Sequence, residues 1–186
     1  MTDPQMTDDE RSRVVRLLQQ TRDDFLVTVG SVSDAQWDFR PGPDRWSIGL
    51  VAEHLGLVEL GLFSRVELAL EGETNPDWES LTEKNGLIEQ TLQDRGTPRH
   101  APERVVPTGT VGREEALRIY RERRVRSLTF AETTTAQLKT HTLDHHRPVF
   151  GTLNAFQWLL YIPLHNQRHI EQIAEIKTAP DYPSRN

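Results

Sequence analysis

Apolar residues recur every three or four positions in four long stretches of the chain, and no stretch shows a sustained alternation of apolar and polar positions. This period predicts amphipathic helices. The first helix opens at Thr7 and Glu10, which have the spacing of a capping box, and it stops at Gly30. The second begins near Ser47, a residue type that caps helices well, and runs to about Leu70.

Two further helices are predicted in the second half of the chain. The third starts after Gly112, and the fourth starts after Thr152 and runs to about Lys177. The connection 71–109, between the second and third helices, is longer than structureless loops usually are in compact domains. We therefore expect a short extra helix over 79–94.

This order of helices predicts an all-α fold, a four-helix bundle with one long crossover between the second and third helices. Bundles of this kind hold metal sites between facing helices. A chain of 186 residues has the usual size of one domain. We expect a single domain over 1–186, with its core at about 7–178 and flexible termini.

Charge and hydropathy exclude several classes of partner. The 22 Lys and Arg residues against 28 Asp and Glu residues give a net charge of −6, which disfavours nucleic acid. No apolar run approaches the roughly 18 residues of a membrane span. The acidic start of the chain is not typical of a secretory signal, so we expect a cytoplasmic protein with no membrane partner.

The most basic stretch, 113–126, is predicted to form a solvated face of ion pairs. Arg118 lies four residues from both Glu114 and Glu122, and Glu122 lies four residues before Arg126. Residues at this spacing are neighbours on a helix surface, so opposite charges there pair with each other. A nucleic-acid surface would need unpaired basic charge.

The chain has no cysteine. This excludes disulfides, iron–sulfur clusters, cysteine-ligated zinc and a nucleophilic thiol from the protein itself. Histidines and carboxylates remain as the residues that can bind a metal ion.

Three of the seven histidines have informative positions. His165 and His169 are four residues apart on the apolar stripe of the fourth helix, so both rings point inward from one face. His54 borders the inward face of the second helix. Three imidazoles from two facing helices can hold one metal ion and leave a coordination position open, as catalytic metal sites do.

Spacing alone leaves alternatives open. An inward histidine is more often a hydrogen-bonded core residue than a metal ligand. His141 and His145 have the same spacing but lie in an irregular connection, 141–148. We expect them to be solvated, and the alternative is that they line a mouth of the site. The residues between His165 and His169 lack the glutamate of zinc peptidases, so peptidase activity is not supported and the catalytic residues are unknown.

Neighbouring residues suggest supporting roles. Gln172 and Asn166 are candidates for orienting the ligand imidazoles, and Trp158 for lining a pocket. Glu53 adjoins His54 in sequence but points about 100° away on a helix, so we do not assign it as a general base.

Several segments, taken in order, resemble the DinB superfamily. Residues 46–55 resemble its Trp-Ser…His-Leu segment, and residues 165–173 resemble its His-x-x-Arg-His-x-x-Gln pattern. Residues 107–109 and 150–158 are similar to its approaches to the third and fourth helices. The helix order and the long crossover agree as well.

The resemblance implies that His54, His165 and His169 hold one divalent metal ion. Zinc and nickel suit three imidazoles best, and iron and cobalt are the other options. Members of the family are often homodimers, so the same assembly is implied here. Characterised relatives include S-transferases that use the thiols bacillithiol or mycothiol, a maleylpyruvate isomerase, and proteins described as metal-dependent hydrolases.

Two functions of different classes follow as hypotheses. In the first, the metal ion lowers the pKa of a water or of a low-molecular-weight thiol, which then attacks a small electrophilic substrate. The enzyme would be a hydrolase or a thiol S-transferase. In the second, the bundle binds metal without catalysis and serves as a stress-related binding or dimerisation module.

Overall fold

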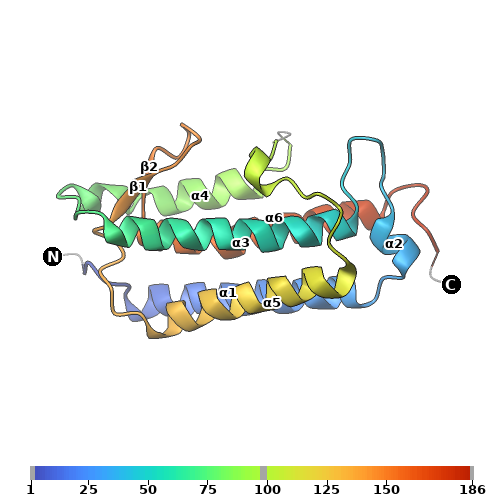
Figure 1. Ribbon diagram of the computed structural model, residues 1–186. Coiled ribbons are helices and arrows are strands. Elements are labelled where there is room, and N and C mark those ends of the chain that lie inside the picture. The colour runs from blue at the N-terminus through green and yellow to red at the C-terminus, as the bar shows by residue number, and fades with distance from the viewer. Residues whose placement is uncertain (1–2, 97–99, 185–186) are drawn as a thin grey trace.

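The computed structural model describes residues 3–96 and 100–184. Four long helices run side by side along the molecule (Figure 1). In chain order they are α1 (Asp8–Gly30), α3 (Ile48–Glu71), α5 (Arg113–Thr133) and α6 (Ala155–Lys177). Helix α3 contacts α5 and α6, and α1 contacts the same two helices. The predicted all-α four-helix bundle is confirmed.

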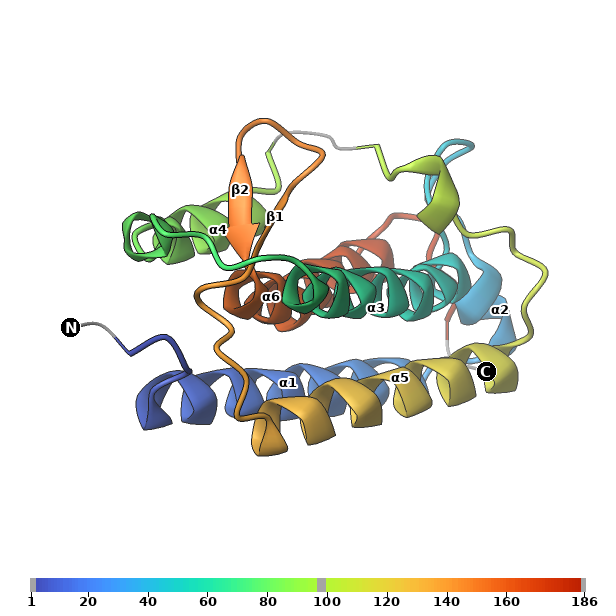
Figure 2. The ribbon, with the colours of Figure 1, turned by 60° about the vertical axis from the view of Figure 1, so that its left-hand side comes forward.

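The elements form three layers (Figure 2). Helices α1 and α5 make one layer, α3 and α6 the next, and the shorter elements of the two connections lie over α3 and α6. These shorter elements are the 3-10 turns η1 (Trp78–Leu81) and η2 (Glu103–Val105), helix α4 (Lys84–Gln93), and strands β1 (Thr142–Asp144) and β2 (Thr152–Asn154). The remaining helix, α2 (Asp34–Asp38), packs against α3.

Capping residues fix where the long helices begin. Thr7 and Asn154 start α1 and α6 with complete capping boxes. The Ser47 hydroxyl accepts a hydrogen bond from the Leu50 N–H at the start of α3. Helix α5 begins directly after Gly112. The predicted beginnings of α1, α3 and α5 are thus confirmed.

The crossover from α3 to α5 contains the expected extra helix. Within the predicted range 79–94 lie most of η1 and all of α4. Helix α4 packs along α6. The crossover therefore brings additional side chains to the outer face of the α3–α6 pair.

The prediction of an irregular connection at 141–148 is wrong for 142–144, which form strand β1, and is confirmed for 145–148. Strands β1 and β2 pair in antiparallel register, with Leu143 opposite Leu153. The Lys84 ammonium of α4 holds this hairpin by donating to the carbonyls of Phe150 and Thr152. Three-residue strands are too short to show an alternating pattern, and β2 delays the start of α6 to Ala155.

A buried ion pair lies in the core between the layers. Arg124 of α5 binds both carboxylate oxygens of Glu59 of α3, at 2.7 and 3.0 Å. Its guanidinium also donates to the Leu18 carbonyl and the Thr21 hydroxyl of α1. Paired and hydrogen-bonded in this way, the two charges tie three helices together.

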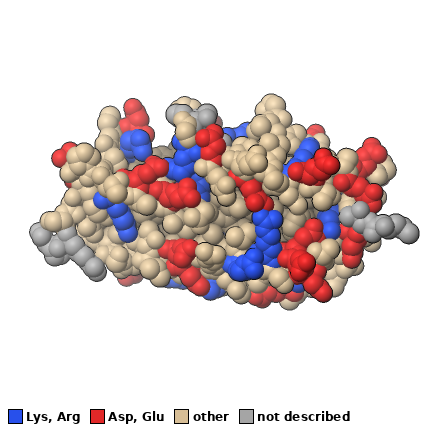
Figure 3. Space-filling view, turned by 180° about the vertical axis from the view of Figure 1, so that it is seen from behind, with Lys and Arg blue, Asp and Glu red and all other residues tan. Residues whose placement is uncertain are grey.

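Surface charges are mixed in sign. On the face shown in Figure 3, acidic and basic side chains are interspersed. Along α5, Arg118 binds Glu122 as predicted, but its second partner is Glu115, three residues before it, instead of the residue four before. Arg126 pairs with Glu67 of α3 instead of the predicted Glu122. Among the described helices, none is both long enough and apolar enough to cross a membrane.

Candidate metal centre

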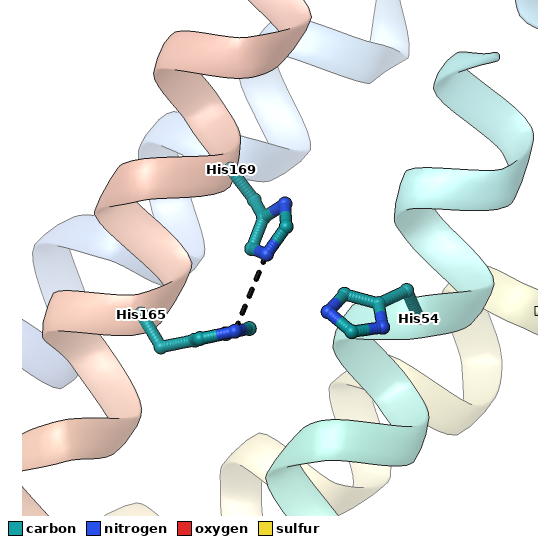
Figure 4. Close-up of side chains that lie close together, drawn as sticks. All are labelled: His54, His165 and His169. Atoms are coloured by element: carbon teal, nitrogen blue, oxygen red, sulfur yellow. Dashed lines mark hydrogen bonds between the residues drawn. The ribbon is translucent and has the colours of Figure 1, made fainter. Parts of the chain in front are cut away.

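The three predicted histidines meet between α3 and α6. His54 comes from α3, and His165 and His169 come from successive turns of α6 (Figure 4). Each offers a ring nitrogen, and these three nitrogens lie within 4.8 Å of one another. The Nε2 atoms of His165 and His169 are 3.3 Å apart.

Hydrogen bonds on the far side of two rings fix which nitrogen faces the cluster. His54 Nδ1 lies 2.7 Å from the Val105 carbonyl oxygen, and His169 Nδ1 lies 2.7 Å from Gln172 Oε1. Because both oxygens accept, each Nδ1 carries the proton and each Nε2 keeps its lone pair. The predicted orienting role of Gln172 matches this contact.

Asn166 does not orient an imidazole. Its Oδ1 accepts a hydrogen bond from the Tyr120 hydroxyl of α5, at 3.2 Å, so its side chain serves helix packing. Its Nδ2 is buried without a hydrogen-bond partner among the described residues.

Burial keeps all three imidazoles neutral at physiological pH. Desolvation lowers the pKa of His54 to about 4. Desolvation, followed by the neighbouring histidines, also holds the pKa values of His165 and His169 well below their usual range. Neutral imidazole is the form that binds a metal ion.

The geometry and the donor set fit a divalent transition metal. Tetrahedral sites with metal–nitrogen bonds of about 2.0–2.1 Å separate their nitrogens by about 3.3–3.4 Å. The 3.3 Å between the Nε2 atoms of His165 and His169 matches this value. Three imidazoles suit zinc, nickel, iron or cobalt better than magnesium or calcium, which prefer oxygen ligands.

Glu53 serves the site indirectly, through the crossover. Its carboxylate accepts hydrogen bonds from the Thr108 N–H and hydroxyl and from the Gly109 N–H, at 2.8 to 2.9 Å. Gly109 has a φ of 74°, which favours glycine at this turn. These bonds hold the loop after η2, and with it the Val105 carbonyl, against α3. As expected, Glu53 does not face the cluster as a base.

The histidines line a cavity of about 490 Å³. Aromatic and aliphatic side chains make much of its wall, among them Trp46, Val58, Leu62, Trp158 and Tyr161. The predicted pocket-lining position of Trp158 is therefore confirmed. The Trp46 ring packs against His54, with centroids 4.7 Å apart.

The prediction that His145 is solvated is wrong, and the alternative that it lines the site is confirmed. The β1–β2 hairpin places its ring in the cavity wall, stacked on Trp158 at 4.9 Å between centroids. His145 is only 7% exposed, and burial lowers its pKa to about 4. The hairpin that buries it gave no periodic signal. His141, by contrast, contacts the Gly72 carbonyl and is not among the residues that line the cavity.

Sequence reasoning also missed the arginines of the cavity. Six described arginines line it: Arg45, Arg65, Arg95, Arg104, Arg147 and Arg168. They come from the turn before α3, from α3 and α6, from the crossover and from the hairpin. Because the fold gathers them from separate segments, no single stretch of sequence indicated the cluster.

Comparisons with known proteins agree on fold and family. A family model of the DinB superfamily matches residues 17–173. The uncharacterized protein YuaE of Bacillus subtilis is 27% identical over 153 residues, covering 78% of this chain and 86% of YuaE. The structure of Bacillus subtilis YfiT, described as a probable metal-dependent hydrolase with an unusual four-helix bundle topology, superposes with a TM-score of 0.64 at 18% identity, covering 92% of this chain and 88% of YfiT.

Proposed function

Because the chain belongs to the DinB superfamily, we propose that it is a metal-dependent hydrolase whose ion is held by His54, His165 and His169. The observation that carries the proposal is the convergence of three neutral imidazoles, at metal-ligand spacing, on the wall of a cavity. The description of YfiT as a probable metal-dependent hydrolase supports the same reaction class.

When bound, a divalent ion at such a site acts as a Lewis acid and lowers the pKa of water towards neutrality. The chain contributes the rest. The three ligands are uncharged, so they leave the full positive charge of the site available for this effect. The Val105 carbonyl and Gln172 hold two of the rings in one tautomer. Trp46 packs against the His54 ring, and apolar side chains form part of the cavity wall around the three rings.

We assign no general base. Of the described carboxylates that line the cavity, Glu175 is engaged by Arg95 through both oxygens, and Asp44 lies on an exposed turn. Neither belongs to the histidine cluster.

The decisive experiment combines metal analysis with an activity panel. Purified protein should contain one divalent ion per chain and hydrolyse small activated esters or amides, and a chelator should abolish the activity. His54→Ala and His169→Ala should lose both metal and activity, whereas the control His141→Ala, outside the cavity, should keep both. Metal retained in His54→Ala and His169→Ala would contradict the proposed ligands.

The same panel separates the other functions. Product formation only when a low-molecular-weight thiol is added would identify an S-transferase instead, with the small molecule supplying the sulfur that this cysteine-free chain lacks. A full complement of metal without turnover of any substrate, with or without thiol, would favour the non-catalytic module.

The oligomeric state needs a separate measurement. In size-exclusion chromatography, elution of the native protein at twice its chain mass would support the expected homodimer.

A further inference from the structure

The cavity has a charge opposite to that of the chain. The whole protein carries a net charge of −6. Its cavity is nevertheless lined by six described arginines and only two described carboxylates, Asp44 and Glu175. A low-dielectric pocket strengthens the field of such charges, so an excess of one sign selects ligands of the other.

Helices α3 and α6 run in opposite directions (Figure 1). The residues that line the cavity include Trp46 before α3 and Arg65 far along α3, so one end of the cavity lies near Trp46 and the other near Arg65. At one end, Trp46 stacks on His169, with centroids 6.3 Å apart. Arg65 marks the other end, because it lies three turns after His54 on the same face of α3, about 16 Å further along the helix axis. Helical side chains lean towards the N-terminus of their helix, so the Arg65 side chain leans back towards His54.

Positive charge at the Trp46 end is compensated. Both carboxylate oxygens of Glu175 accept from Arg95, at 2.7 and 2.6 Å. Arg45 lies 3.9 Å from the same carboxylate. Asp44 adds a second carboxylate beside Arg45, and the Arg168 guanidinium donates to the carbonyls of Leu92 and Asp94. This end therefore leaves less positive charge for a ligand than its arginines alone would supply.

Positive charge at the Arg65 end is not compensated. Neither Arg65 nor Arg104 pairs with a carboxylate anywhere in 3–96 and 100–184, and the Arg147 guanidinium donates to the neutral His100 carbonyl, at 3.2 Å. All three line the same cavity as His146, and after desolvation their positive charges lower the pKa of His146.

We propose that Arg65, Arg104 and Arg147 form a binding site for an oxyanion, a carboxylate or phosphate group of a small-molecule substrate. Guanidinium groups match both oxyanions with paired hydrogen bonds, and these bonds are stronger than those between neutral groups. The cavity volume of about 490 Å³ is that of a small-molecule site. The inference rests on the proposed function in one respect: it assumes that the reacting part of the substrate lies at the histidines.

Calorimetric titration of the full-length protein tests this site. The probes are succinate, its uncharged isostere succinamide, and inorganic phosphate, in a buffer of low ionic strength. Each is titrated into chelator-treated and into metal-loaded protein, because an anion could otherwise bind to the ion itself. The variants are Arg65→Gln and Arg104→Gln, with Arg121→Gln, an exposed arginine of α5 outside the cavity, as the control.

We expect succinate or phosphate to saturate the metal-free protein and succinamide to bind at least about tenfold more weakly. Each cavity variant should weaken anion binding about tenfold, and Arg121→Gln should leave it unchanged. The tighter of the two anions identifies the group as carboxylate or phosphate. The inference would be overturned if neither succinate nor phosphate bound more tightly than succinamide, or if anion affinities were equal in all variants.

These outcomes are separable from failure of the proposed function. Arginine-dependent anion binding by a protein that never takes up metal would leave the oxyanion site standing and remove the hydrolase. Stoichiometric metal on the histidines, with anion binding that ignores Arg65 and Arg104, would remove the oxyanion site alone.

Discussion

The residues that shape the candidate centre most directly are those that hold its imidazoles from behind. The Val105 carbonyl fixes His54 from the crossover, and Gln172 fixes His169 from the next turn of α6. The spacing of the histidines and the position of Gln172 could be predicted from sequence, because all three residues of α6 follow one helix period. The Val105 contact could not, because it depends on where a long crossover returns to the bundle.

Replacing Gln172 tests the supporting role at the metal. Gln172→Ala should lower the affinity for the metal about tenfold, because the His169 ring loses the acceptor that fixes its tautomer and orientation. Competition with a chromophoric chelator measures this affinity. Gln20→Ala, an exposed substitution on α1, is the matched control. Equal metal affinities in Gln172→Ala and Gln20→Ala would show that Gln172 does not support metal binding.

Burial of His145 makes a specific prediction for pH. Its pKa is about 4 in the folded protein against about 6.5 in an unfolded chain, so between these values only the unfolded state takes up the proton. The contribution of His145 to stability is therefore complete above about pH 6.5 and is lost as the pH falls towards 4.

Urea unfolding of the metal-free protein at several pH values measures this effect. The free energy of unfolding of His145→Gln should fall less between pH 7 and 4.5 than that of the wild type. We expect a difference of about 1 kcal/mol, less than the full pKa shift implies, because the ring borders a cavity open to water. Parallel pH profiles would contradict the assigned burial.

Among the elements, helices were predictable and the hairpin was not. Each long helix has a repeated apolar stripe, and three of the four predicted starts agree with the structure, at Thr7, Ser47 and Gly112. The β1–β2 hairpin has three-residue strands, and its position depends on Lys84 of α4, far away in sequence. Without this hairpin, Arg147 was missed as a cavity residue and His145 was expected at the cavity only as the alternative to a solvated position. The cavity was therefore less predictable than the three clustered histidines.

The contact between the crossover and α3 can be tested through Glu53. Glu53→Ala should lower the free energy of unfolding by about 2 kcal/mol, because the Thr108 and Gly109 donors lose a charged acceptor. It should also weaken metal binding, since the Val105 carbonyl is no longer held against His54. Glu53→Gln, which keeps one acceptor oxygen, should lose less of both, and the exposed Glu114→Ala should change neither. A loss of metal affinity as large in Glu114→Ala as in Glu53→Ala would contradict this coupling.

At the scale of the whole molecule, the buried ion pair of the core and the metal-binding histidines lie on opposite sides of the α3–α6 layer. The layer of α3 and α6 faces the core on one side and the cavity on the other, and no described residue of α1 or α5 lines the cavity. The buried Arg124–Glu59 pair lies on the core side, where it joins α3, α5 and α1. Substitutions on the core side, at Arg124 and Glu59, should therefore change stability without changing metal binding.

Arg124→Met tests this separation. It should cost about 3–5 kcal/mol in the free energy of unfolding, because Glu59 is left buried without its counter-charge. Adding Glu59→Met in the same chain should recover most of that loss. Below the unfolding transition, the double variant should bind metal as the wild type does. A double variant as unstable as the single one would show that packing, and not the unpaired charge, sets the cost.

The central claim is that one divalent ion binds to His54, His165 and His169. Anomalous diffraction from crystals of the metal-loaded protein, recorded at the absorption edge of the bound element, tests it most directly. We predict one strong anomalous peak about 2.0–2.2 Å from the Nε2 atoms of all three histidines. The claim would be contradicted by an anomalous peak at another place in the protein. It would also be contradicted if crystals of protein that contains the metal showed no peak at the three histidines.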